Sequence, residues 1–188
     1  MKPPPHEPTD AELVERIRGG DARAFEALYR RHRDWVVRTA YRFAGDEDDA
    51  LDVLQETFAY LVRRRERLTL TARMTTFLYP VVRHFAWKRA RKRRHVPLER
   101  APEPIATDDT PGTVERRELV ARLLARLPEA QREVVVLRYL DGLRLEEIAD
   151  ALRVPLGTVK SRLHAALKAL REPGGGEKRT AEEGGVEG

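Results

Sequence analysis

The chain of 188 residues contains no cysteine. It therefore forms no disulfide, no zinc–thiolate centre and no cysteine nucleophile, and this composition suits a reducing cytosol. No apolar run approaches the roughly 20 residues that a membrane-spanning helix needs, and residues 1–6 lack the apolar core of a signal peptide. We expect a cytoplasmic protein without membrane insertion.

Catalytic signatures are also missing from the sequence. There is no glycine-rich phosphate loop and no His-Glu metal motif. The acidic cluster at residues 46–49 is explained more simply as a helix start, because negative charge is favourable at the positive end of the helix dipole. These absences argue against a nucleic-acid enzyme, and we expect no catalysis, no metal and no cofactor.

The residues that are present favour a basic, helical protein. Lys and Arg number 36 against 31 Asp and Glu, the net charge is +5 and the isoelectric point is about 9.7. Such a chain is attracted to polyanions. Apolar residues recur at helical spacing and no strand-like alternation competes with it, so the predicted fold is all-α. Because 36% of the residues are charged, we expect two small helical domains rather than one large core.

Proline and glycine divide the chain. A proline-rich stretch without helical or strand period predicts a flexible linker at residues 96–112. Glycine-rich and polar composition predicts a disordered tail at residues 173–188, and the leading residues 1–8 are expected to be disordered as well. The two helical domains then span residues 9–95 and 113–172.

Helix start and stop signals recur in the first domain. Thr9 and Glu12 have the spacing of a capping box, and Asp21 is suited to cap the next helix. Pro80 lies inside the fourth expected helix and should kink it or displace its start. The expected helices run from Thr9 to Gly19, from Asp21 to about Phe43, from residues 46–49 to about Arg65, and through Phe77 and Phe85 into a basic run.

The fourth helix carries cations beside aromatic rings. Cations neutralise phosphates and flat rings stack with unpaired bases, so this combination favours single-stranded DNA. Alternatively, Phe77 and Phe85 belong to the core and the cations form a solvated helix end. We favour the core for the two phenylalanines and DNA binding for the cations. The candidate residues are Tyr79, Arg83, His84, Trp87, Lys88, Arg91, Lys92 and Arg93.

Residues 142–164 have the pattern of a helix-turn-helix. Apolar residues at i, i+3, i+4 and i+7 from Leu145 to Leu152 predict one buried helix face, and Pro155 is suited to begin a second helix. Between them Arg153 is expected to adopt a strained left-handed conformation. A basic surface helix with merely solvated charges is the alternative, but the preceding helix and turn favour insertion into a major groove. The candidate DNA-binding residues are Pro155, Gly157, Thr158, Lys160, Ser161, Arg162, His164 and Lys168.

In this order the segments resemble the parts of an extracytoplasmic-function (ECF) sigma factor of the sigma-70 family. The resemblance rests on residues 52–58, on residues 76–79 with the basic helix after them, and on residues 127–139 with 157–162. It implies that Asp52, Gln55 and Glu56 dock on the clamp helices of RNA polymerase, that the fourth helix melts and reads the −10 element, and that the helix-turn-helix reads the −35 element. Departures from the usual family residues at Phe77, His84, Lys88 and Ala165 mark a divergent member.

The resemblance implies an initiation factor whose partners are core RNA polymerase and promoter DNA. It leaves open whether an anti-sigma factor is a further partner. The alternative from the residues alone is a stand-alone helix-turn-helix regulator with an N-terminal dimerisation or input domain. Such a regulator binds a double-stranded operator without polymerase, whereas a sigma factor needs core polymerase to bind a promoter well.

Overall fold

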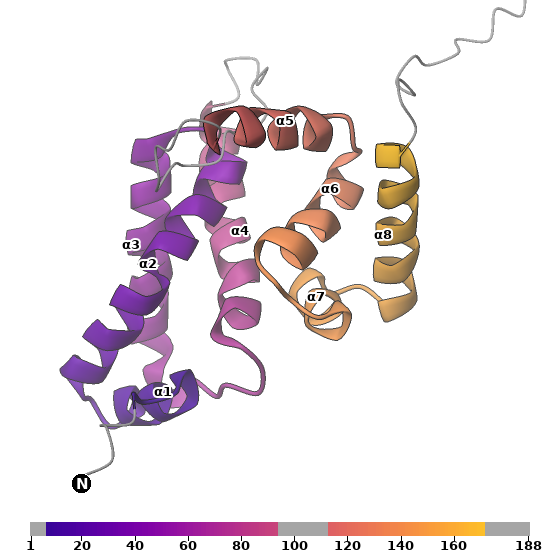
Figure 1. The fold of residues 1–188 in the computed structure, drawn as a ribbon. Helices are drawn as coiled ribbons and strands as arrows, with labels where there is room; N and C mark the ends of the chain where they lie inside the picture. The colour runs from indigo at the N-terminus through magenta and orange to yellow at the C-terminus, as the bar shows by residue number, and fades with distance from the viewer. Residues whose placement is uncertain (1–6, 94–112, 172–188) are drawn as a thin grey trace, which may run out of the picture.

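The computed structural model describes residues 7–93 and 113–171, and within these ranges it contains helices and no strand (Figure 1). The expected linker at 96–112 and tail at 173–188 lie outside the described residues, as does most of the expected lead. The elements are α1 (Asp10–Arg18), α2 (Ala22–Ala44), α3 (Glu47–Arg64), η1 (Arg65–Arg67), α4 (Met74–Arg93), α5 (Thr113–Ala125), α6 (Glu129–Val135), η2 (Val136–Leu140), α7 (Leu145–Leu152) and α8 (Leu156–Arg171).

The predicted helix starts are confirmed by their capping contacts. The backbone N–H of Glu12 donates to Thr9 Oγ1 at 3.3 Å, and the backbone N–H of Thr9 donates to the Glu12 carboxylate at 2.7 Å. These are the two bonds of a capping box. Asp21 Oδ1 accepts from the backbone N–H groups of Arg23 and Ala24 at 2.9 and 3.1 Å. Both caps satisfy amide groups that have no partner within the helix.

Helices α2, α3 and α4 pack side by side, and α1 lies across one end of them (Figure 1). Their shared core is apolar, with Leu28, Val36, Val53 and Val82 fully buried. Pro80 neither ends α4 nor displaces its start, because the helix begins at Met74 and continues to Arg93. Phe77 and Phe85 pack against this core as expected.

The C-terminal helices contain the predicted helix-turn-helix. Ile148 of α7 and Val159 of α8 are fully buried, which holds the two helices together. Between them Arg153 has φ 55° and ψ 47°, so the expected left-handed conformation is confirmed. Its side chain is exposed. The next amide, that of Val154, closes the turn by donating to the Ala149 carbonyl at 3.1 Å.

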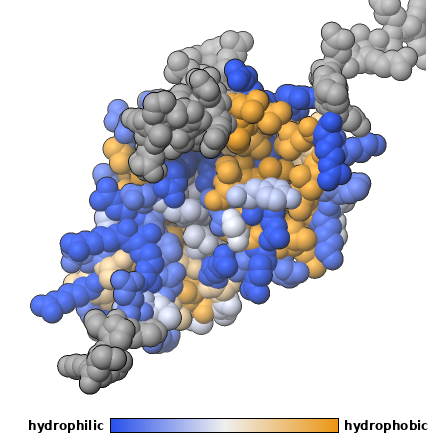
Figure 2. All heavy atoms as spheres, viewed as in Figure 1, coloured by the Kyte–Doolittle hydropathy of each residue, from blue (hydrophilic) through white to orange (hydrophobic). Residues whose placement is uncertain are grey.

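The two groups of helices pack against each other, which the sequence did not predict. Their buried side chains form one connected cluster that includes Leu78 and Val82 of α4, Leu137 of η2 and Ile148 of α7. Figure 1 shows α7 beside α4, and Figure 2 shows apolar side chains gathered over the C-terminal helices. Apolar burial therefore holds the second group against α4.

The left-handed turn generates a stability prediction. Replacing Arg153 by Gly removes the steric strain of a β-carbon at positive φ, which costs on the order of 1 kcal/mol, while the greater entropy of glycine in the unfolded chain opposes the gain. We expect Arg153→Gly to raise the free energy of unfolding by some tenths of a kcal/mol up to about 1 kcal/mol. Thermal melts of the full chain measure it.

Gly45 provides the opposite control, because it ends α2 with φ 69° and a β-carbon there would meet no atom within 4 Å. Gly45→Ala adds strain that outweighs the lower entropy of the unfolded chain, and it should lower the free energy of unfolding by some tenths of a kcal/mol up to about 1 kcal/mol. A lower melting temperature for Arg153→Gly would contradict the strain assignment and would show that the Arg153 side chain makes a stabilising contact.

Candidate DNA and polymerase interfaces

Helix α8 presents a polar face away from the core. Val159 and Ala166 are fully buried and fix the helix rotation. Ser161 Oγ donates to the Thr158 carbonyl at 3.0 Å, which leaves its oxygen as an acceptor. Of the predicted residues, Thr158 and Arg162 are half-buried. The exposed ones are Pro155, Gly157, Lys160, Ser161, His164 and Lys168.

A second exposed face lies on α4. His84, Trp87, Lys88 and Arg91 are exposed and follow one another at i, i+3, i+4 and i+7, so they share one side of the helix. We name these four residues the α4 stripe. Lys92 and Arg93 also belong to α4, but their side chains lie outside the described part of the structure. The stripe combines cations with an indole ring, as the sequence predicted.

A groove of about 690 Å³ runs between the α4 stripe and the turn between α7 and α8. The stripe residues line one side, and Leu152 and Arg153 line the other. The guanidinium of Arg83 lies 4.7 Å from the centre of the Trp87 ring, a cation–π contact at the edge of this groove. The groove is therefore cationic and aromatic on the side that belongs to α4.

Two further residues predicted to contact DNA are turned towards α6 instead. Tyr79 is only 2% exposed, and its hydroxyl donates to Glu133 Oε1 at 2.6 Å. Burial, reinforced by the Glu133 charge, raises the pKa of Tyr79 well above its ordinary value, so the phenol stays protonated as the donor. Arg83 Nε lies 2.8 Å from the same carboxylate oxygen. In this arrangement Glu133 binds both side chains, so the Tyr79 ring is not exposed in this structure.

The predicted polymerase-docking residues lie on α3, and Arg89 of α4 binds two of them. Its guanidinium donates to Asp52 and, at 2.8 Å, to Glu56. Contact with these carboxylates, above all the hydrogen bond to Glu56, raises the pKa of Arg89. Asp52 remains 47% exposed at its side chain, and Gln55 lies on the exposed side of the helix. The sequence did not reveal Arg89 as their partner, because spacing along α3 carries no signal for a cation on another helix.

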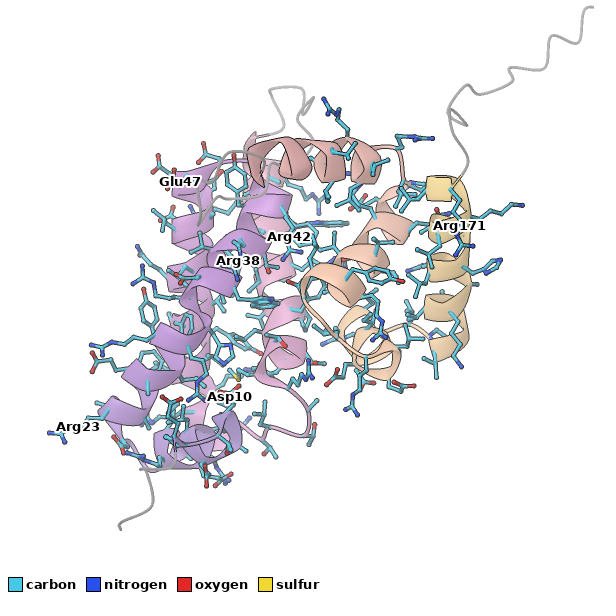
Figure 3. All side chains as sticks on the ribbon, in the orientation of Figure 1. Asp10, Arg23, Arg38, Arg42, Glu47 and Arg171 are labelled. Carbon is cyan, nitrogen blue, oxygen red and sulfur yellow. The ribbon has the colours of Figure 1, made fainter. Side chains whose placement is uncertain are left out.

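The carboxylate of Asp141 joins the two groups of helices. Its side chain is 5% exposed. Trp35 Nε1 donates to Asp141 Oδ1 at 3.0 Å, and Arg42 donates to both carboxylate oxygens at 3.1 Å. Arg42 lies on the side of α2 that faces the C-terminal helices (Figure 3). Nearby Arg73 donates to the Gly142 carbonyl at 3.1 Å. Sequence reasoning missed all of these contacts.

The described residues also bear on other kinds of site. Within residues 7–93 and 113–171, no group of three or more His, Asp or Glu side chains is arranged to hold a metal ion. No helix in that part of the chain is both long and apolar enough to cross a membrane.

Comparison with known proteins identifies the parts. Residues 28–96 match the model for sigma-70 region 2, and residues 117–170 match the model for sigma-70 region 4. The RNA polymerase sigma-E factor of Streptomyces coelicolor is 38% identical over 81% of this chain and 87% of its own. The ECF RNA polymerase sigma factor SigM of Mycobacterium tuberculosis is 32% identical over 88% of this chain and 84% of its own.

Solved structures share the fold. The structure of CnrH in complex with the cytosolic domain of CnrY matches with a TM-score of 0.66 and 24% identity, over 86% of this chain and 94% of the matched chain. The sigma factor RpoE from Bartonella quintana, in complex with the anti-sigma factor NepR, matches with a TM-score of 0.57 and 21% identity, over 73% and 88% of the two chains. With both family regions present in order, this chain belongs to the sigma-70 family, in its ECF group, and functions as an RNA polymerase sigma factor.

Proposed function

We propose that this sigma factor reads promoter DNA through two separate surfaces, one on each domain. The first domain spans residues 9–95 and contains the α4 stripe, and the second spans residues 113–172 and contains the outer face of α8. The observation that carries the proposal is that both helices expose cations on the side opposite their buried face. Two such surfaces suit a protein that contacts two DNA elements at once.

The α4 stripe is proposed to bind the melted −10 element. Lys88 and Arg91 neutralise phosphates, while Trp87 and His84 offer flat rings for stacking with unpaired bases. Lys92 and Arg93 extend the same cationic run, and Tyr79 and Arg83 join it once Glu133 releases them. Single-stranded DNA is the favoured ligand because aromatic stacking needs bases that are not paired.

The outer face of α8 is proposed to enter the major groove at the −35 element. Pro155 and Gly157 allow close approach of the helix N-terminus, where the backbone and Thr158 meet phosphate. Ser161 and His164 lie further along the exposed side and reach base edges. Lys160, Arg162 and Lys168 contribute charge to the phosphate backbone.

The α3 face with Asp52, Gln55 and Glu56 is proposed to dock on basic clamp helices of core polymerase. The half-exposed Asp52 carboxylate and the outward Gln55 support this role. Arg89 acts here as a positioning residue, because it holds Asp52 and Glu56 in fixed orientations. A fixed carboxylate loses less side-chain entropy on binding than a free one.

The chain itself is proposed to have no catalytic activity, because the polymerase carries out RNA synthesis. It is proposed to act in the cytoplasm, where that enzyme transcribes. An anti-sigma factor is a further proposed partner, supported by the neighbour solved with NepR. Transcription from a promoter library by core polymerase, with and without this chain, tests the proposal. A chain that binds duplex DNA alone but adds no promoter-dependent transcription would be a stand-alone regulator instead.

For polymerase docking we expect Asp52→Asn with Gln55→Ala to weaken core binding by roughly tenfold and to reduce its salt dependence, because the double substitution removes one charge pair and one polar group. Asparagine keeps an acceptor for Arg89, so helical content should be unchanged by circular dichroism. Binding titrations measure the affinity. Asp34→Asn on α2, whose side chain is 68% exposed, removes the same charge elsewhere, and equal affinities for the two variants would exclude this docking face.

For −35 recognition we expect His164→Ala to change the preferred bases, at about 1–3 kcal/mol for each good base contact that the substitution removes, whereas Lys160→Ala should weaken all sequences alike. Selection of duplexes from a random pool by the sigma–polymerase complex measures the preference. Arg23→Ala on the exposed side of α2 is the matched control for removal of a cation. If His164→Ala selects the wild-type sequence, the groove assignment of α8 is wrong.

For the positioning role we expect Arg89→Met to lower the free energy of unfolding by about 1–2 kcal/mol, because two charge-assisted bonds to partly buried carboxylates are broken. Arg30→Met is the control, because it breaks the ion pair of Arg30 with Glu26, in which the two side chains are 74% and 58% exposed. This substitution should lower the free energy of unfolding by less than about 0.5 kcal/mol. Urea unfolding compares them. Arg89→Met should also weaken core binding at temperatures where it is fully folded, an effect that a purely structural role does not predict.

A further inference from the structure

Beside the apolar cluster, most polar contacts between the two regions are made by acidic side chains of region 4. Glu133 of α6 binds Tyr79 and Arg83, and Asp141, which follows η2, binds Trp35 and Arg42. Both carboxylates are nearly enclosed, at 9% and 5% side-chain exposure. In the closed arrangement each carboxylate accepts charge-assisted or short hydrogen bonds from donors of region 2, and these bonds favour contact between the regions.

Within the described structure, neither carboxylate has a side-chain bond to another residue of region 4. All the side-chain bonds described for Glu133 and Asp141 go to residues of region 2. Glu147 differs, because it accepts the backbone N–H of Arg144 at 2.7 Å and so caps α7 in addition to meeting Arg73. Glu133 and Asp141 are therefore committed to the contact between the regions.

The same contact covers part of the proposed −10 surface. Glu133 takes the guanidinium of Arg83 and the hydroxyl of Tyr79, and a DNA phosphate needs the same donors. The α4 stripe stays exposed, and so does the outer face of α8. The closed arrangement therefore removes some −10 contacts while leaving the −35 face open.

We propose that Glu133 and Asp141 form an acidic latch that keeps the free sigma factor closed, with Glu133 of region 4 bound to Tyr79 and Arg83. The latch opens when polymerase and promoter DNA separate the two regions. The proposal rests on the assignment of α4 to the −10 element. It implies that the free protein binds single-stranded DNA more weakly than a fully open protein would. Only the open fraction of the molecules presents all the cationic and aromatic side chains of α4 to the DNA.

The test uses the full chain with Glu133→Gln and Asp141→Asn, which keep the side-chain shapes and remove the charges. The matched control is Glu146→Gln with Asp150→Asn, which removes the same charge from exposed positions of α7. Because the chain has no cysteine, Ala59→Cys on α3 and Arg171→Cys on α8 accept a donor and an acceptor dye in every version. Both positions are exposed.

We expect the latch variant to show lower energy transfer than the wild type, and the control variant to match the wild type. Fluorescence anisotropy with a short single-stranded DNA of random sequence should give a roughly fivefold to tenfold tighter Kd for the latch variant than for the control. With duplex DNA of the same length, the two variants should bind alike, because the closed form leaves α8 exposed.

Unchanged energy transfer in the latch variant would overturn the latch. Opening without tighter single-strand binding would overturn the claim that region 4 covers the −10 surface. An open variant that binds neither DNA would instead contradict the proposed promoter surfaces. If the latch variant fails to fold, Arg42→Gln offers a second test, because it breaks the contact with Asp141 from the side of region 2. This variant should also show lower energy transfer than the wild type. A closed Arg42→Gln chain would contradict the proposal.

Discussion

The buried carboxylate of Asp141 sets the arrangement on which the rest of the structure depends. A carboxylate at 5% exposure is tolerated only when donors surround it, and here the donors come from Trp35 and Arg42 on α2. Ridge-and-groove packing alone leaves helices some freedom to slide and rotate. The bidentate arginine restricts that freedom, because two parallel bonds require one orientation. Asp141 follows η2, which continues directly from α6, so this orientation also helps to set how Glu133 of α6 meets Tyr79 of α4.

Local features of the fold could be predicted from the sequence because their causes are local. Amides at a helix start need partners within a few residues, so Thr9 and Asp21 mark the starts of α1 and α2. A chain that reverses between two short amphipathic helices needs a left-handed residue, and this requirement alone predicts the conformation of Arg153. Both predictions use distances of only a few residues along the chain.

Contacts between distant segments could not be predicted in this way. Tyr79 and Glu133 are 54 residues apart, and Arg89 and Asp52 are 37 apart. The sequence pattern assigns Tyr79 to DNA because it is an aromatic residue near cations. The helical period instead indicates that Tyr79 is buried. Tyr79, Val82 and Ala86 share one face of the helix at i, i+3 and i+7, and all three are buried. Periodicity shows that a face is buried, but it does not show which helix covers it.

Helix α4 shows how one basic segment serves two purposes. Its outward cations, Lys88 and Arg91, are exposed, whereas Arg83 and Arg89 turn towards neighbouring helices. A helix with cations on several sides packs into a protein only if the inward ones meet acidic partners, because an unpaired buried charge is costly. Those partners come from α3 on one side of α4 and from α6 on the other. The acidic residues proposed for polymerase docking and for the latch therefore both hold α4, the helix proposed to bind DNA. A change at either neighbour therefore acts on α4, the helix proposed to bind DNA, through a single guanidinium on each side.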